Sequence, residues 1–129
     1  MRFLMLYRPA YVSGMESGTA PDPEMILRMG SLIQRKIDEG KLLATEGCMQ
    51  SSKGARVRLK GGKINVTDGP FSETKELVAG FALFRVGSKQ EAIQEAREFL
   101  DVAGEGEVEI RQIHDADNCI ESTKLNHQV

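Results

Sequence analysis

The alternation of apolar and polar residues between positions 55 and 68 predicts a β-hairpin. Gly61-Gly62 is a two-residue turn signal, and apolar and polar residues alternate on both sides of it. Because residues two apart share one face of a strand, we expect one face of this hairpin to be apolar and buried, and the other to be polar. The expected cross-strand pairs are Leu59–Ile64, Val57–Val66 and Arg58–Asn65.

Two other stretches carry apolar residues at helical spacing and therefore predict two helices. The first begins at Asp22, which we expect to cap the helix, with Pro23 in the first helical position, and it ends at Gly40. The second begins at Ser88, with Glu91 three residues later, which is the spacing of a capping box. The apolar positions are Met25, Ile26, Met29, Leu32, Ile33 and Ile37 in the first helix, and Ala92, Ile93, Ala96, Phe99 and Leu100 in the second.

Four short apolar or alternating runs predict the remaining strands. They are residues 3–7, 42–49, 79–86 and 107–113. With the hairpin they give the order β-α-β-hairpin-β-α-β, which is the α+β, ferredoxin-like split βαβ pattern with an inserted hairpin. Right-handed crossovers would place both helices on one face of an antiparallel sheet. We expect one domain over residues 1–114 and a polar C-terminal tail over residues 115–129.

The face of this sheet that lies away from the helices is expected to be apolar. Residues 3–7 and 79–86 carry apolar side chains on both of their faces. An apolar sheet face of that size needs a partner in water. We therefore expect a homodimer that forms mainly through this face.

Charge and hydropathy exclude two classes of partner. The chain of 129 residues has 17 basic and 19 acidic residues, and its basic residues are scattered rather than gathered on one element, so we expect no nucleic-acid binding. The longest apolar stretch, residues 77–84, is too short to cross a bilayer. The apolar run before Arg8 is too short for a signal peptide. We expect a cytoplasmic protein that does not bind membranes.

No residue pattern in the chain indicates a metal or a cofactor. Cys48 and Cys119 are far apart and match no ligand spacing, so we expect two thiols that are not bonded to each other. His114 and His127 follow the last predicted strand, where adventitious metal binding is the most that they support. The chain also has no glycine-rich phosphate loop and no nucleophile elbow.

The run Asp68-Gly69-Pro70-Phe71-Ser72-Glu73-Thr74-Lys75-Glu76 resembles the signature of the DGPF branch of the YCII-related proteins. Glu46-Gly47, Gly80-Phe81 and the helix start at Ser88 fit the same resemblance, which covers about residues 2–113. The resemblance implies a dimeric α+β barrel. It also hints at a role in regulation, because genes of this branch often neighbour genes for extracytoplasmic-function sigma factors.

The broader YCII-related proteins resemble small enzymes with a proposed His–Asp pair, whose histidine lies in the first helix. The first predicted helix contains no histidine, and Met25 or Met29 occupies the face where one would be needed. Asp38 corresponds to an acidic position near the end of that helix. The pair therefore does not carry over to this chain.

Six residues are the candidates for a site. Asp68 follows a hairpin strand, where its carboxylate either serves as a base or ligand anchor or only forms an Asx-type turn before Gly69-Pro70. Glu46 lies inside an apolar strand, where an unpaired carboxylate would be costly. Either its side of the strand is exposed or its carboxylate is paired, for example with Arg58. The functional alternative is a role in acid–base catalysis. The ligand-binding candidates are Asp68, Glu73, Lys75, Arg58 and Tyr7, and the catalytic candidates are Asp68 and Glu46.

Each of the other candidates also has a structural interpretation. Glu73 and Lys75 belong either to a solvated charged stretch or to the rim of a cleft in which Lys75 binds an anion. Tyr7 and Arg58 line the same cavity in the functional interpretation, whereas Tyr7 is otherwise a residue of the core.

Three functions are compatible with these observations. The first is a dimeric module that binds a small polar or anionic molecule in a pocket near Asp68. The second is a lyase, hydrolase or isomerase that needs no cofactor and uses a carboxylate as its base. The third is a regulatory protein that acts through protein contacts. Since no nucleophile or acid–base pair stands out, we place the binding module first.

Overall fold

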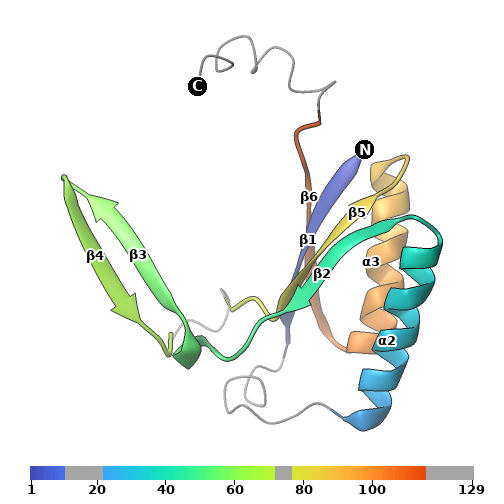
Figure 1. Ribbon diagram of the computed structural model, residues 1–129, viewed down its shortest axis with the longest axis horizontal. Helices are drawn as coiled ribbons and strands as arrows, with labels where there is room; N and C mark the ends of the chain where they lie inside the picture. Colours follow the sequence, from blue (N-terminus) through green and yellow to red (C-terminus); the bar gives the residue numbers. More distant parts are fainter. Residues whose placement is uncertain (11–21, 72–76, 116–129) are drawn as a thin grey trace.

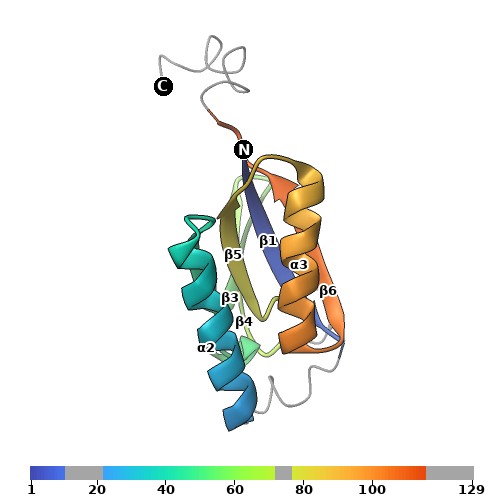
Figure 2. The ribbon, with the colours of Figure 1, turned by 90° about the vertical axis from the view of Figure 1, so that its right-hand side faces the viewer.

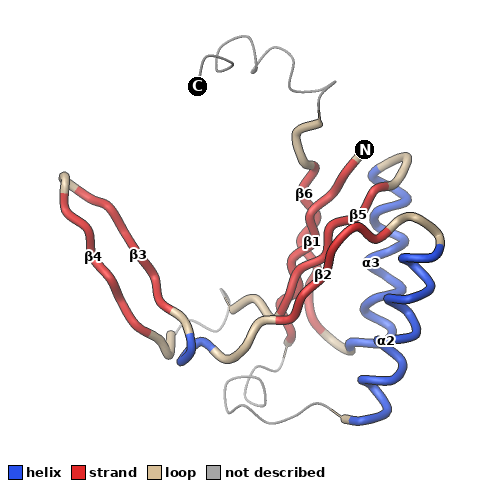
Figure 3. Tube along the Cα trace, in the orientation of Figure 1, coloured by secondary structure: helices blue, strands red, loops and turns tan. Residues whose placement is uncertain are grey.

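The computed structural model describes residues 1–10, 22–71 and 77–115. Figures 1 and 3 show a sheet with two helices on one side and a separate hairpin on the other side. The elements are β1 (Arg2–Pro9), α2 (Pro23–Asp38), β2 (Leu42–Gly47), a short 3-10 helix η1 (Ser51–Lys53), β3 (Ala55–Lys60), β4 (Lys63–Asp68), β5 (Gly80–Arg85), α3 (Lys89–Ala103) and β6 (Gly106–Gln112).

The main sheet has four antiparallel strands in the order β2-β5-β1-β6. Both helices cover the same face of it, as Figure 2 shows. This is the α+β, ferredoxin-like arrangement that the sequence predicts, with the β3–β4 hairpin inserted between the two strand–helix–strand halves.

Local sequence explains where the helices begin and end, with one correction. Pro23 opens α2 as predicted, and Gly40 follows the helix with a φ of 74°, a value that favours glycine. Asp22, however, makes no side-chain capping hydrogen bond, so its predicted capping role is wrong. At α3 the prediction holds, because the Ser88 hydroxyl oxygen accepts a hydrogen bond from the Glu91 backbone N–H at 3.1 Å.

The hydrophobic core lies between the sheet and the helices. Phe3 and Met5 of β1 and Phe84 of β5 point into it, and Ala92 and Ala96 of α3 close over them. The alternate residues of the same strands lie on the opposite face, where Leu4 pairs with Leu83 and Leu6 pairs with Phe81. We call these four half-buried residues the far face.

The hairpin has the predicted register but not the predicted burial. Its cross-strand pairs include Val57–Val66, Arg58–Asn65 and Leu59–Ile64, as the sequence indicates. Its apolar face is nevertheless exposed, with exposed fractions between 61% for Ile64 and 69% for Val57. Figure 1 shows why, since the hairpin extends away from the four-stranded sheet and none of the described core elements covers it. We call residues 55–68 the arm.

Among the described residues, neither helix has the length and apolar character needed to cross a membrane.

Candidate functional site

A cavity of about 190 Å³ lies between the four-stranded sheet and the two helices. Its walls are mainly apolar side chains, including Met29, Leu32 and Ile33 of α2 and Phe99 of α3. The sheet contributes residues from all four strands, among them Met5, Thr45, Ala82, Phe84 and Val108. Since every described helix and strand of the core contributes to it, the cavity is a product of the whole fold.

Tyr7 supplies one of the few polar groups of this cavity. Its ring packs edge-on against Phe99 with 5.0 Å between the ring centroids. Its hydroxyl group lies 3.3 Å from the carbonyl oxygen of Glu105, to which it donates a hydrogen bond. Burial raises the pKa of the Tyr7 hydroxyl above its usual value, so this group is a neutral donor at physiological pH.

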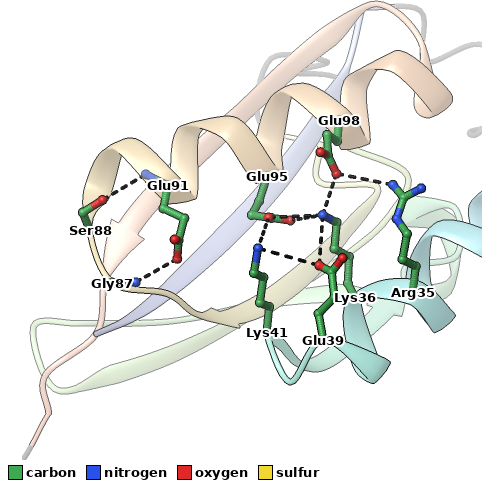
Figure 4. A network of polar contacts seen from close by, with 9 residues as sticks. All are labelled: Arg35, Lys36, Glu39, Lys41, Gly87, Ser88, Glu91, Glu95 and Glu98. Atoms are coloured by element: carbon green, nitrogen blue, oxygen red, sulfur yellow. Dashed lines mark hydrogen bonds and ion pairs between the residues drawn. The ribbon is translucent and has the colours of Figure 1, made fainter.

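A buried ion pair between the helices also borders the cavity. Lys36 of α2 and Glu95 of α3 have side chains that are only 6% and 3% exposed, and both residues line the cavity. Their charged groups meet with 3.0 Å between Nζ and Oε2. Figure 4 shows that Glu98, Glu39, Lys41 and Arg35 extend this pair into a network, in which Lys36 Nζ lies 2.6 Å from Glu98 Oε2.

The network keeps Lys36 protonated. Burial on its own would lower the pKa of Lys36, but hydrogen bonds to Glu98 and Glu95 and the charges of the two carboxylates outweigh burial, so the pKa is raised. In return, the hydrogen bond from Lys36 lowers the pKa of Glu98. Lys36 is therefore a cation whose charge is already matched by neighbouring carboxylates.

Glu95 is the least satisfied member of this network. Its Oε1 accepts hydrogen bonds from Lys36 at 3.2 Å and from Lys41 at 3.5 Å. Its Oε2 lies 3.0 Å from Lys36 Nζ but receives no hydrogen bond of good geometry from the described residues. A buried carboxylate oxygen without a hydrogen bond is uncommon in proteins and marks Glu95 as a candidate site residue.

The structure brings two of the predicted site residues to this cavity. Tyr7 lines it, and Glu46 borders it from the edge strand β2. Glu46 itself is exposed, which agrees with the first of the alternatives that the sequence left open for it.

The other predicted site residues lie elsewhere. Asp68 and Arg58 are exposed on the arm and do not line this cavity. Glu73 and Lys75 lie outside the described residues. The proposed binding roles of these four residues stay predictions.

The motif Asp68–Phe71 forms the base of the arm. Gly69 donates a backbone hydrogen bond to the Gly54 carbonyl oxygen at 3.0 Å, and the Phe71 N–H donates to the Ser51 hydroxyl oxygen at 3.0 Å. The guanidinium group of Arg56 stacks 3.9 Å above the centre of the Phe71 ring. A Cβ atom at Gly69 would overlap the Ser51 carbonyl oxygen, so this position requires glycine.

Sequence reasoning missed Lys36 and Glu95, although a signal for both was present. Lys36 continues the apolar series Met29, Leu32 and Ile33 at helical spacing, and Glu95 lies among the apolar positions Ala92, Ala96 and Phe99 of the second helix. One charged residue within the apolar stripe of each of two neighbouring helices indicates a buried ion pair.

The described residues contain no group of three or more His, Cys, Asp or Glu side chains placed to hold a metal ion. Cys48 is exposed and has a free thiol. Cys119, its predicted unbonded counterpart, lies outside the described part of the chain.

Comparison with known proteins identifies the family. Residues 1–117 match the YCII-related domain, and the chain belongs to this family, as its resemblance predicts. An uncharacterized protein of Rhizobium meliloti (strain 1021) is 34% identical over 94 residues, which cover 71% of this chain and 76% of the relative. A solved structure of 5-chloro-2-hydroxyhydroquinone dehydrochlorinase from Burkholderia phenoliruptrix, in complex with 2,5-dihydroxybenzoquinone, is similar with a TM-score of 0.41 and 15% identity, over 92% of this chain and 99% of that chain.

Proposed function

We propose that this YCII-related protein binds a small, largely apolar molecule in the cavity between its sheet and its helices. The observation that carries this proposal is the cavity itself, which is lined mainly by apolar side chains and bordered by a few polar groups. Binding sites for small molecules have this composition. A cavity of about 150 Å³ in a protein interior holds a benzene molecule, so the volume of about 190 Å³ fits a single ring with one or two small substituents.

The lining favours a neutral ligand over the polar or anionic one expected from the sequence. The cation at the cavity, Lys36, already lies within 3.4 Å of carboxylate oxygens of Glu39, Glu95 and Glu98. An anionic ligand would have to compete with these carboxylates for one ammonium group, and its own desolvation would be costly. The Tyr7 hydroxyl and the Thr45 hydroxyl, which donates to the Phe81 carbonyl oxygen at 2.8 Å, already have partners as well.

Titration with phenol and with toluene, followed by two-dimensional NMR of the backbone amides, tests this function. We expect chemical-shift changes that cluster at residues around the cavity, such as Phe99. Ala82→Leu fills part of the cavity, and we expect it to weaken binding of either probe by at least about 10-fold, the effect of one or two misplaced methylene groups. Ala55→Leu, at an exposed position of the arm, is the matched control. Shift changes confined to other surfaces, or equal binding by Ala82→Leu and the wild type, would contradict the proposal.

Catalysis without a cofactor is the second candidate function, and Glu95 is the observation that favours it. Glu95 lines the cavity, is almost fully buried and has one carboxylate oxygen without a hydrogen bond from the described residues. It replaces Asp68 and Glu46 as the carboxylate best placed to act as a base. For any compound that the protein converts, Glu95→Gln should lower turnover by about 100-fold or more, the contribution of a general base. Unchanged turnover would exclude this role. The regulatory role implied by the DGPF resemblance stays a prediction.

A further inference from the structure

The wall of the cavity contains a hydrogen-bond acceptor with capacity to spare. Among the described residues, Oε2 of Glu95 is the only buried side-chain oxygen or nitrogen atom that receives or makes no hydrogen bond. Glu95 lines the cavity, as does Phe99, which follows it by about one helical turn on the same face of α3. In binding sites that are mostly apolar, a few polar groups fix the orientation of the ligand and provide specificity. Glu95 is placed to be such a group.

The charges around Glu95 determine which kind of donor it can accept. Figure 4 shows its carboxylate between Lys36 and Lys41, with 3.0 Å from Lys36 Nζ to Oε2 and 3.5 Å from Lys41 Nζ to Oε1. A cationic ligand would bring a third positive charge close to these two ammonium groups, and an anionic ligand would meet the carboxylate itself. A neutral O–H or N–H group avoids both kinds of repulsion.

The other polar side chains of the wall are weaker acceptors than Glu95. The hydroxyl groups of Tyr7 and Thr45 are neutral, and each already donates to a backbone carbonyl oxygen, at 3.3 and 2.8 Å. Glu46 is exposed, so water competes for its carboxylate. A hydrogen bond to an ionised acceptor is roughly twice as strong as one between neutral groups. A donor on a ligand in the cavity therefore gains most by pointing at Glu95.

We propose that the cavity is specific for neutral ring compounds that carry a hydrogen-bond donor, and that the carboxylate of Glu95 accepts the hydrogen of that donor, a specificity that rests on the proposed function of the cavity. Compounds with a hydroxyl or amino group on a single ring belong to this class. The apolar walls hold the ring, and Glu95 fixes which way it points. Recognition of this kind involves no transfer of the proton to Glu95.

A comparison of phenol with toluene isolates the contribution of the donor. The two molecules have nearly the same size and differ by a hydroxyl group in place of a methyl group. In an apolar cavity without an acceptor, toluene would bind more tightly, because phenol would lose its hydrogen bonds to water. With Glu95 as the acceptor, we expect phenol to bind more tightly than toluene by at least about 10-fold, as a hydrogen bond to a charged group implies. Anisole has the oxygen atom of phenol but not the proton, so it should bind no more tightly than toluene.

Titration of the full-length wild type with these three probes at pH 7, where phenol is neutral, is the first test. The dissociation constants and the sites of the backbone amide shift changes are both measured. If all three probes shift amides around the cavity but toluene or anisole binds as tightly as phenol, the specificity is refuted and the proposed function stands. If no probe shifts these amides, the proposed function is refuted together with the specificity.

The double variant Lys36→Met/Glu95→Leu tests whether Glu95 is the acceptor. It removes the carboxylate together with its buried cationic partner, so neither charge is left alone. We expect the order of affinities to be reversed, with toluene more tightly bound than phenol. Arg35→Met is the matched control, since it removes an exposed member of the same network that does not line the cavity, and it should keep the preference for phenol. A double variant that still prefers phenol would overturn the assignment to Glu95.

Two further measurements separate Glu95 from the other acceptors of the wall. Tyr7→Phe and Thr45→Val each remove one hydroxyl group, and both variants should keep the preference for phenol. Loss of the preference in either variant would assign the acceptor to that hydroxyl and overturn the role of Glu95. If the double variant does not fold, the ¹³C chemical shift of the Glu95 carboxyl carbon in the wild type decides instead. This shift should change with phenol and not with toluene, and an equal response to the two probes, or none to phenol, would refute the contact.

Discussion

Replacing Lys36 with methionine tests the energetic role of the buried pair beside the cavity. The change keeps the length of the side chain and removes its charge. In the wild type, Lys36 Nζ lies 2.6 Å from Glu98 Oε2, 3.0 Å from Glu95 Oε2 and 3.4 Å from Glu39 Oε1. Glu98 and Glu39 are partly exposed, so water can solvate their carboxylates after the ammonium group is removed. Glu95 is 3% exposed and has no such compensation.

The expected loss of stability follows from the charge that remains. Removing one partner of a buried ion pair costs about 3–5 kcal/mol, because the other charge is left in a medium that solvates it poorly. Lys41 remains 3.5 Å from Glu95 Oε1 and is partly exposed, so it offsets part of this cost. We therefore expect Lys36→Met to lower the free energy of unfolding by about 3 kcal/mol, at the lower end of that range.

Urea unfolding at pH 7, followed by circular dichroism, measures this loss. The double variant Lys36→Met/Glu95→Leu removes both charges, and we expect it to return to within about 1 kcal/mol of the wild type or to exceed it. Arg35→Met is the exposed control, since Arg35 is 59% exposed and lies 3.4 Å from Glu98, and its effect should stay below about 1 kcal/mol. The reasoning is refuted if Lys36→Met costs no more than Arg35→Met, or if the double variant is as unstable as the single one.

Two further predictions concern the base of the arm and the acid side of the stability curve. Gly69→Ala forces a methyl group against the Ser51 carbonyl, so urea unfolding should show a loss of about 1–3 kcal/mol, whereas Gly87→Ala, where the added methyl meets no atom within 4 Å, should be nearly neutral. The lowered pKa of Glu98 gives stability that is complete above its ordinary pKa of 4.5 and is lost as the pH falls through the lower folded value. Stability measured from pH 7 to pH 3 should therefore fall less steeply in Glu98→Gln than in the wild type, and parallel curves would contradict this assignment.

The parts of the fold that depend on neighbouring residues were predictable from the sequence. The start of α2 at Pro23 and the Ser88 cap of α3 involve contacts within one turn of helix. The register of the arm likewise follows from Gly61-Gly62 and the alternation beside it. The exposure of the arm was not predictable in this way, because alternation states which residues share a face but not what that face meets.

The site was less predictable because it depends on residues that are distant in the sequence. The Lys36–Glu95 pair joins two helices, and its members are 59 residues apart. Either residue alone resembles an ordinary surface charge that happens to lie in an apolar stripe. Only the packing of α2 against α3 shows that the two meet and bury each other. Asp68 gives the opposite case, since its local motif is conspicuous in the sequence, yet the residue lies exposed on the arm and does not line this cavity.

The motif at residues 68–71 and the cavity therefore have separate roles. Gly69 gives the close approach to Ser51, and Phe71 gives the aromatic surface beneath Arg56, so the motif sets the direction in which the arm leaves the sheet. The cavity is built from the core elements and none of its lining residues belongs to the motif. A change at Gly69 should therefore disturb the base of the arm while the binding of phenol in the cavity persists. A change at Ala82 should weaken phenol binding and leave the arm unchanged. The direction of the arm thus accounts for a glycine and an aromatic residue at these positions without any chemistry at Asp68.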